Sequence, residues 1–139
     1  MNDINTIKQE QIRIGQHIEE ARKRLEGKKE SFSELLLSLI EKSQMKESEV
    51  YRKACIDRRH FYKIKKNADY SPNKKTVVAF ALALELSLVE TSQLLNSAGY
   101  ALSESLIFDI IIAYFIENEM YDIYEINQTL YHYKLPVFQ

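Results

Sequence analysis

Residues that form tight turns are scarce in this chain. It holds only three glycines and two prolines among 139 residues. A β-sandwich or β-barrel needs a turn about every ten residues, and Gly and Pro supply many of those turns. Apolar residues make up 45% of the chain and charged residues 28%, which is typical of a folded globular protein. We therefore expect an all-α fold.

The single cysteine and the hydropathy pattern indicate a cytoplasmic protein. Cys55 has no partner for an internal disulfide, which fits a reducing compartment. No secretion signal is seen at the N-terminus. The most apolar run, residues 105–116, is too short to cross a bilayer and contains Asp109. We expect no membrane contact, and we expect Cys55 to be a small buried residue rather than a redox sensor.

Residues 1–29 form the first of three expected segments. Apolar side chains recur there every three or four residues and polar ones lie between, which predicts an amphipathic helix ending at a break near Gly27. This helix could pair with a second copy of itself or lie on its own domain. The apolar stripe consists of Ile4, Ile7, Ile14, Ile18 and Leu25, with Gln11 and Ala21 at the remaining heptad positions.

Residues 30–100 form the second segment, with five helices expected between about residues 31 and 99. The run at residues 76–86 is apolar nearly all round, as a central core helix would be. Gly99 is expected to end the fifth helix. The helix-start signals are Ser31 with Glu34, Asp57 as a side-chain cap for the N–H of Arg59 or His60, Ser71 before Pro72, and Ser87 with Glu90.

Residues 101–139 form the third segment and are expected to fold as a helical hairpin. Ser103 and Asp122 are the expected caps of its two helices, and Pro136 bars continuation of the second. The segment is rich in tyrosine and isoleucine, more than a hairpin alone buries. It is expected to pack either on the core or on a partner, and tyrosine is common at protein interfaces.

Charge is strongly segregated along the chain. Residues 1–45 balance eight basic with eight acidic side chains. Residues 46–75 hold ten basic and four acidic side chains, a net of +6, and residues 76–139 hold one basic and eight acidic, a net of -7. The total of -1 thus hides a basic middle and an acidic end, which indicates two faces with different roles.

The basic charge centres on residues 49–67, EVYRKACIDRRHFYKIKKN. The apolar positions predict two short helices joined by a turn. The second helix would then carry an exposed cationic face with a tyrosine, suited to the phosphates and base edges of a DNA major groove. An ordinary solvated helix is the alternative. The buried positions are Val50, Ala54, Ile56, Phe61 and Ile64, and the outward ones are Arg58, Arg59, Tyr62, Lys63 and Lys66.

With these apolar positions, the run from Ser31 to Gly99 resembles the lambda-repressor-like, Cro-type (XRE) helix-turn-helix domain. That family packs five helices and reads DNA with the third. The chain departs from the family at Tyr51, where a small alanine is usual, and at Cys55, where glycine is usual. The resemblance implies base contacts by Arg58, Arg59, Tyr62 and Lys63. It implies phosphate contacts by Lys65, Lys66 and Lys74. Lys75 is expected to be a fourth phosphate contact, because it lies where the next helix is expected to begin.

The expected function is therefore sequence-specific binding of double-stranded DNA by a bacterial transcriptional regulator, most simply a repressor. Such domains generally dimerise to place two reading helices about 34 Å apart, here through the N-terminal helix or the C-terminal hairpin. The alternative is an adaptor module of the same fold that recruits a protein through the hairpin and does not read DNA. No catalytic motif, cofactor site or metal site is expected, since His17, His60 and His132 lack metal-ligand spacing.

Overall fold

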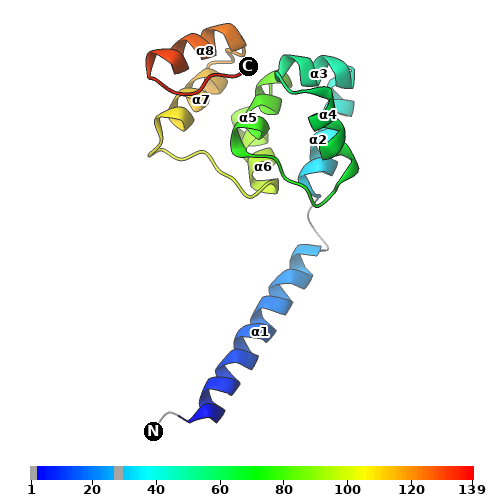
Figure 1. Cartoon of the computed structure of the whole chain (residues 1–139), viewed down its shortest axis with the longest axis vertical. Coiled ribbons are helices and arrows are strands. Elements are labelled where there is room, and N and C mark those ends of the chain that lie inside the picture. The colour runs from blue at the N-terminus through cyan, green and yellow to red at the C-terminus, as the bar shows by residue number, and fades with distance from the viewer. Residues whose placement is uncertain (1–2, 27–29) are drawn as a thin grey trace.

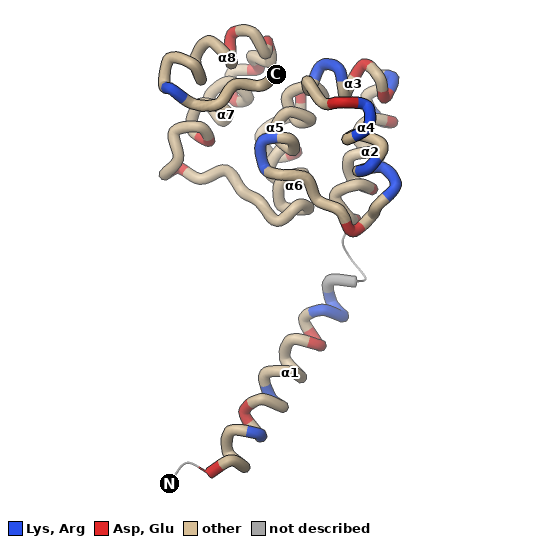
Figure 2. Tube along the Cα trace, in the orientation of Figure 1, with Lys and Arg blue, Asp and Glu red and all other residues tan. Residues whose placement is uncertain are grey.

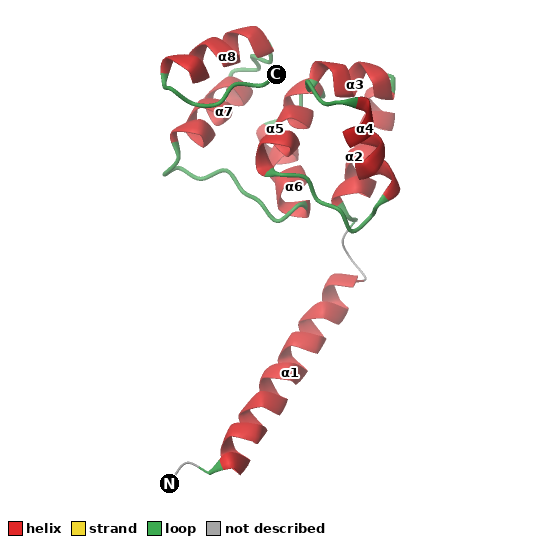
Figure 3. Ribbon diagram, viewed as in Figure 1, coloured by secondary structure: helices red, strands yellow, loops and turns green. Residues whose placement is uncertain are grey.

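The computed structural model describes residues 3–26 and 30–139, and all regular structure in these ranges is helical (Figures 1 and 3). The all-α expectation is confirmed, with one helix before residue 30, five between residues 31 and 99 and two after. The helices are α1 (Ile4–Glu26), α2 (Phe32–Ser43), α3 (Glu47–Lys53), α4 (Arg58–Lys66), α5 (Lys74–Ala83), α6 (Leu88–Ser97), α7 (Ile107–Glu117) and α8 (Ile123–His132).

The first helix, α1, stands apart from the other helices (Figure 1). Its four striped isoleucines, at positions 4, 7, 14 and 18, are all exposed. Gly27 and the side chain of Leu25 lie outside the described residues. The expected amphipathic helix is present, and the structure gives its apolar stripe no partner among the described residues of this chain.

The core lies around α5, as the apolar run at residues 76–86 predicts. Val77, Phe80 and Leu82 are buried, and α5 packs against α3 and α6. Phe80 lies between two other buried rings, with ring centroids 6.5 Å from Phe32 and 6.2 Å from Phe61. These aromatic contacts join α2, α4 and α5 into one core.

Several expected helix caps are present. The Ser31 hydroxyl accepts a hydrogen bond from the Glu34 backbone N–H at 3.2 Å. At the start of α6 the Ser87 hydroxyl accepts from the Glu90 N–H, and the Glu90 carboxylate accepts from the Ser87 N–H, both at 3.1 Å. Asp122 caps α8 by accepting from the Tyr124 N–H. These local bonds fix where three of the helices begin.

The caps expected for α5 and α7 are wrong. Helix α5 is capped by Asn73, whose side chain accepts from the Thr76 N–H at 2.9 Å, rather than by Ser71. An asparagine is as good a cap as serine, so the later position prevails. Helix α7 begins after Leu106 without a side-chain cap. Ser103 lies in the loop before it because its backbone N–H donates to the Asp109 carboxylate instead.

Left-handed residues other than glycine end most of these helices, which explains how a chain with so few glycines makes so many turns. After α3, the N–H of Ile56 donates to the Tyr51 carbonyl at 2.8 Å, closing the last turn around left-handed Cys55. The same six-residue bond closes α5, α6, α7 and α8. The left-handed residues are Gln44, Cys55, Glu85, Gly99, Glu119 and Lys134, of which only Gly99 is a glycine.

Cys55 is exposed, which corrects the expectation of a buried residue. It occupies the turn between α3 and α4, outside the apolar positions that face the core. Its φ of 59° is unfavourable for a residue with a Cβ.

Replacing Cys55 with glycine is therefore expected to raise the free energy of unfolding by about 1 kcal/mol. Denaturant melts of the purified chain would measure it. The matched control is Cys55→Ala, which removes the sulfur but keeps the Cβ and should leave stability unchanged. Equal effects of the two variants would contradict the strain argument.

Tyr121 joins the connection between α7 and α8 to the core. Its hydroxyl donates to the Leu86 carbonyl at 2.7 Å. Burial raises the pKa of Tyr121, and the negative charges of Glu119, Glu85 and Glu90 raise it further. Both effects keep the hydroxyl protonated and available as a donor. Within residues 3–26 and 30–139, no helix combines the length and apolar character needed to cross a membrane.

Candidate nucleic-acid interface

The contact between α3 and α4 is built from the apolar positions read in the sequence. Val50, Ala54, Phe61 and Ile64 are buried, while Ile56 is partly exposed. Tyr51 packs its ring against Phe61 with centroids 5.2 Å apart, so the bulky residue contributes to this contact. The buried side of α4 is thereby settled, and its opposite side faces solvent.

Asp57 occupies the N-cap position of α4, but its side chain makes no cap hydrogen bond. The expected carboxylate bond to Arg59 or His60 is wrong. The Asp57 carbonyl accepts from the Phe61 N–H at 3.0 Å, so the backbone starts the helix. The carboxylate is exposed, where water satisfies its oxygens and a cap bond adds little.

The exposed side of α4 carries two rows of side chains. One row runs through Arg58, Tyr62 and Lys65, spaced four and three residues apart along one strip of the helix. Arg59, Lys63 and Lys66 form a second row with the same spacing. All six side chains are exposed, so the structure brings together every residue expected to contact bases and two of those expected to contact phosphates: Arg58, Arg59, Tyr62, Lys63, Lys65 and Lys66.

Tyr62 lies between cations of its own row. The Arg58 guanidinium lies 5.4 Å from the Tyr62 ring centroid, and the Lys65 ammonium lies 5.9 Å from it. Lys65 also pairs with Glu47 at 3.0 Å, which links α4 back to the start of α3. Cation–π contacts of this kind hold the aromatic ring in place at an exposed site. The result is a cationic surface with the Tyr62 phenol between two of its cations.

Tyr70 supports the second row from the loop after α4. The Lys63 ammonium lies 4.5 Å from the Tyr70 ring centroid. The Tyr70 hydroxyl lies 3.1 Å from Nε2 of His60, and the two rings meet edge to face. Sequence reasoning assigned no role to Tyr70. The sequence feature that points to such a role is its place in a polar loop between the pairs Lys65–Lys66 and Lys74–Lys75.

Lys74 and Lys75 do not join this surface, although both were expected to contact phosphates. The Lys74 ammonium lies 2.6 Å from Oδ2 of Asp109, a residue of α7 that is only 1% exposed. The Lys75 ammonium donates to the Val137 carbonyl and lies 5.5 Å from the Phe138 ring centroid. The C-terminal segment therefore occupies both ammonium groups.

The C-terminal tail continues past Lys75 toward the turn before α4. Asn127 fixes the tail, since its amide donates to the Phe138 carbonyl and its oxygen accepts from the Phe138 N–H, both at 2.8 Å. Phe138 is buried, and residues 136–139 line a cavity together with Cys55 and His60. The tail stops short of the cationic rows, because Arg58 and Arg59 stay exposed.

The charge map agrees with the segregation seen in the sequence. Among the helices after residue 30, Lys and Arg gather on α3, α4 and the start of α5 (Figure 2). The segment that contains α7 and α8, residues 101–139, has six acidic residues and one basic residue, Lys134. The cationic rows of α4 thus belong to a basic part of the surface, and the hairpin belongs to an acidic part.

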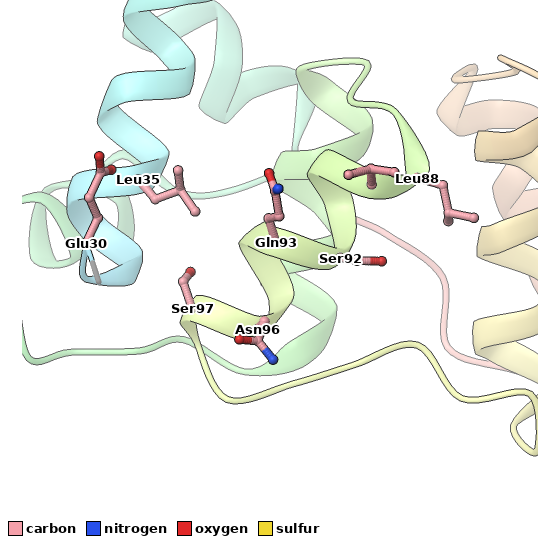
Figure 4. A pocket seen from close by; sticks show the side chains of 8 residues that line it. Glu30, Leu35, Leu88, Ser92, Gln93, Asn96 and Ser97 are labelled. Atoms are coloured by element: carbon pink, nitrogen blue, oxygen red, sulfur yellow. The ribbon is translucent and has the colours of Figure 1, made fainter. Parts of the chain in front are cut away.

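A separate open groove lies between the start of α2 and α6 (Figure 4). Among the residues that the structure describes, its lining consists of amides, hydroxyls and apolar side chains, with Glu30 as the one charged residue. Because its described lining offers no cation, this groove attracts phosphate less than the face of α4 does and is a weaker candidate for nucleic-acid contact. The lining residues are Glu30, Leu35, Leu88, Val89, Ser92, Gln93, Asn96 and Ser97.

In the part of the chain that the structure describes, no three His, Cys, Asp or Glu side chains lie close enough together to hold a metal ion. His60 and His132 instead pack against tyrosines. Comparison of the chain with protein-family models, curated proteins and solved structures found no match.

Proposed function

We propose that this protein binds double-stranded DNA in a sequence-specific manner, with α4 entering the major groove, and acts as a bacterial transcriptional regulator. The observation that carries the proposal is the cationic face of α4. Its six polar side chains are exposed while the opposite side is buried against α3 and the core. A helix held in this way presents donors to base edges without unfolding any part of the domain.

The roles follow from position along α4. Arg58 and Arg59 lie in its first turn, where a recognition helix makes most of its base contacts. A guanidinium can donate two parallel hydrogen bonds to guanine O6 and N7. Tyr62 and Lys63, one turn on, would reach an adjacent base or its phosphate. Lys65 and Lys66 at the end of α4 would neutralise the backbone, as positioning contacts do.

The proposal includes the architecture and the mode of action. Helices α2 to α6 would form a lambda-repressor-like helix-turn-helix unit, with α3 and α4 as its DNA-contacting pair. Two copies would place two α4 helices in successive major grooves of one operator. The protein would repress by occupying DNA that polymerase needs, and no cofactor enters this mechanism.

Salt dependence tests the electrostatic part of the proposal. Five cations of α4 are exposed, namely Arg58, Arg59, Lys63, Lys65 and Lys66. If each neutralises one phosphate, the logarithm of the association constant falls against the logarithm of salt concentration with a slope of about -4 to -5 for one bound subunit, and about twice that for a bound dimer. Fluorescence anisotropy of a labelled duplex over a salt series would measure the slope. Undetectable DNA binding at low salt would favour the adaptor alternative.

Selection of bound sequences from a random duplex pool tests specificity. The expected result is a short enriched motif, repeated in inverted orientation with half-sites about one helical turn apart. Enrichment of no motif would overturn sequence-specific reading, even if the protein binds DNA through charge alone.

A further inference from the structure

Two apolar surfaces of this chain have no partner among its described residues, and both lie outside the proposed DNA interface. One is the stripe along α1, where Ile14 is 45% exposed. The other is a groove of about 320 Å³ on the hairpin, between α7 and α8. Exposed apolar patches of this kind commonly mark interaction sites.

The groove has an apolar floor and an apolar rim. Ile111 and Phe115 form its buried floor. The rim is exposed, with Ile110 at 46% and Tyr114 at 58%, and Tyr133 completes it from the end of α8. Residues spaced three and four apart on α7 thus leave one face of that helix uncovered. A groove walled by two antiparallel helices accepts the apolar face of a third helix.

The charges beside the two surfaces are complementary. Glu117 lies three residues after Tyr114, and Glu125 lies four residues before Thr129, so both carboxylates share faces with the groove. In α1 the heptad positions beside the stripe hold three cations and one acid, namely Lys8, Arg22, Arg24 and Glu10. Residues 1–29 carry a net charge of +2 and residues 101–139 a net of -5.

We propose that α1 of one copy docks its isoleucine stripe in the α7–α8 groove of a second copy, and that the exchange is reciprocal. A two-fold dimer of this kind buries both unpartnered surfaces in each chain. Pairing α1 with α1 would leave the groove exposed and bring two segments of net +2 together. Most helical stability in proteins comes from packing an amphipathic face, so α1 gains by docking on a preformed surface. The contact does not depend on DNA binding.

Two substitutions in the full-length chain test the two sides of this contact. Ile14→Asp places a charge on the stripe, and Ile110→Asp places one on the groove rim. Each is expected to raise the dimer dissociation constant by about tenfold or more, because an unpaired carboxylate would be buried. Sedimentation equilibrium measures it. Far-UV circular dichroism checks the fold, and Tyr133→Asp replaces Ile110→Asp if the latter unfolds.

Mixing the two variants distinguishes the proposed reciprocal dimer from other dimer arrangements. The intact α1 of the Ile110→Asp chain fits the intact groove of the Ile14→Asp chain, so the mixture is expected to dimerise more strongly than either variant alone. The matched control is Ile12→Asp, which changes an exposed isoleucine of α1 that lies off the stripe and should leave the dimer intact.

Three results would overturn the proposal. A wild-type chain that is monomeric at all concentrations would show that α1 docks within its own chain or serves another protein. Loss of dimer in the α1 variant but not in the groove variant would indicate α1–α1 pairing. Weakening in both variants without recovery in the mixture would indicate two separate interfaces.

Discussion

Replacing Arg58 and Arg59 together with alanine is expected to weaken binding to a selected DNA site by about 2–4 kcal/mol, a loss of about 30- to 1,000-fold. Both side chains lie in the exposed first turn of α4, and each good bidentate contact to guanine discriminates by about 1–3 kcal/mol. Binding to an unrelated duplex should fall much less, because only charge is lost there. Anisotropy titrations of both duplexes at one salt concentration measure the ratio.

The control for this double variant removes two cations elsewhere. Arg13→Ala with Lys23→Ala makes the same change in net charge at exposed positions of α1 that lie off its apolar stripe. It is expected to leave the specific affinity nearly unchanged. Similar losses in the two double variants would mean that α4 contributes only general charge, and unchanged affinity in the α4 variant would remove its assignment as the reading helix.

Replacing Lys74 with methionine is expected to lower the free energy of unfolding by about 3 kcal/mol. The Asp109 carboxylate is buried, and its Oδ2 accepts from Lys74 and from the Ser103 N–H, each at 2.6 Å. Its Oδ1 has no partner in the described part of the chain. Removing Lys74 would leave a buried charge uncompensated, which typically costs about 3–5 kcal/mol. We expect the lower end of this cost, because the Lys74 side chain is 25% exposed and water can partly solvate the remaining charge.

Two further variants make this stability test decisive. Lys75→Met is the same substitution one residue along, where the ammonium meets a neutral carbonyl and an aromatic ring, so it should cost only about 1.5 kcal/mol. In the double variant Lys74→Met with Asp109→Leu no charge is left buried, and much of the lost stability should return. Chemical denaturation of each variant provides the comparison. Equal losses for Lys74→Met and Lys75→Met would contradict the compensating role of Lys74.

The sequence predicts most of the local structure because the signals are themselves local. A serine hydroxyl and a glutamate three residues later satisfy each other's neighbouring N–H groups wherever they start a helix, as Ser87 and Glu90 do. The apolar spacing from Val50 to Ile64 likewise sets which side of α4 is buried. Local signals fail where two caps compete, as at Ser71 and Asn73, since both fit the same pattern.

The part of the candidate site that escapes sequence reasoning depends on distant contacts. Lys74 and Asp109 are 35 residues apart, and Lys75 and Val137 are 62 apart. No spacing rule connects such pairs, because the packing of the hairpin on the core decides whether they meet. Lysines at a helix start therefore looked free for phosphate, whereas the folded chain places the hairpin and tail on them. The lysines of α4 stay exposed because neither the hairpin nor the C-terminal tail covers the outer face of that helix.

The left-handed helix ends have a practical consequence. Five of these turns carry a side chain where glycine would relax the backbone, and they follow five different helices. Glu85 lines one pocket with Cys55 and shares Tyr121 with Glu119, so the effects at these three sites can couple, whereas sites that share no partner add their effects almost independently. Introducing glycine in turn at these five positions should raise the free energy of unfolding and the melting temperature. The stabilised protein would then tolerate destabilising substitutions elsewhere. The positions are Gln44, Cys55, Glu85, Glu119 and Lys134.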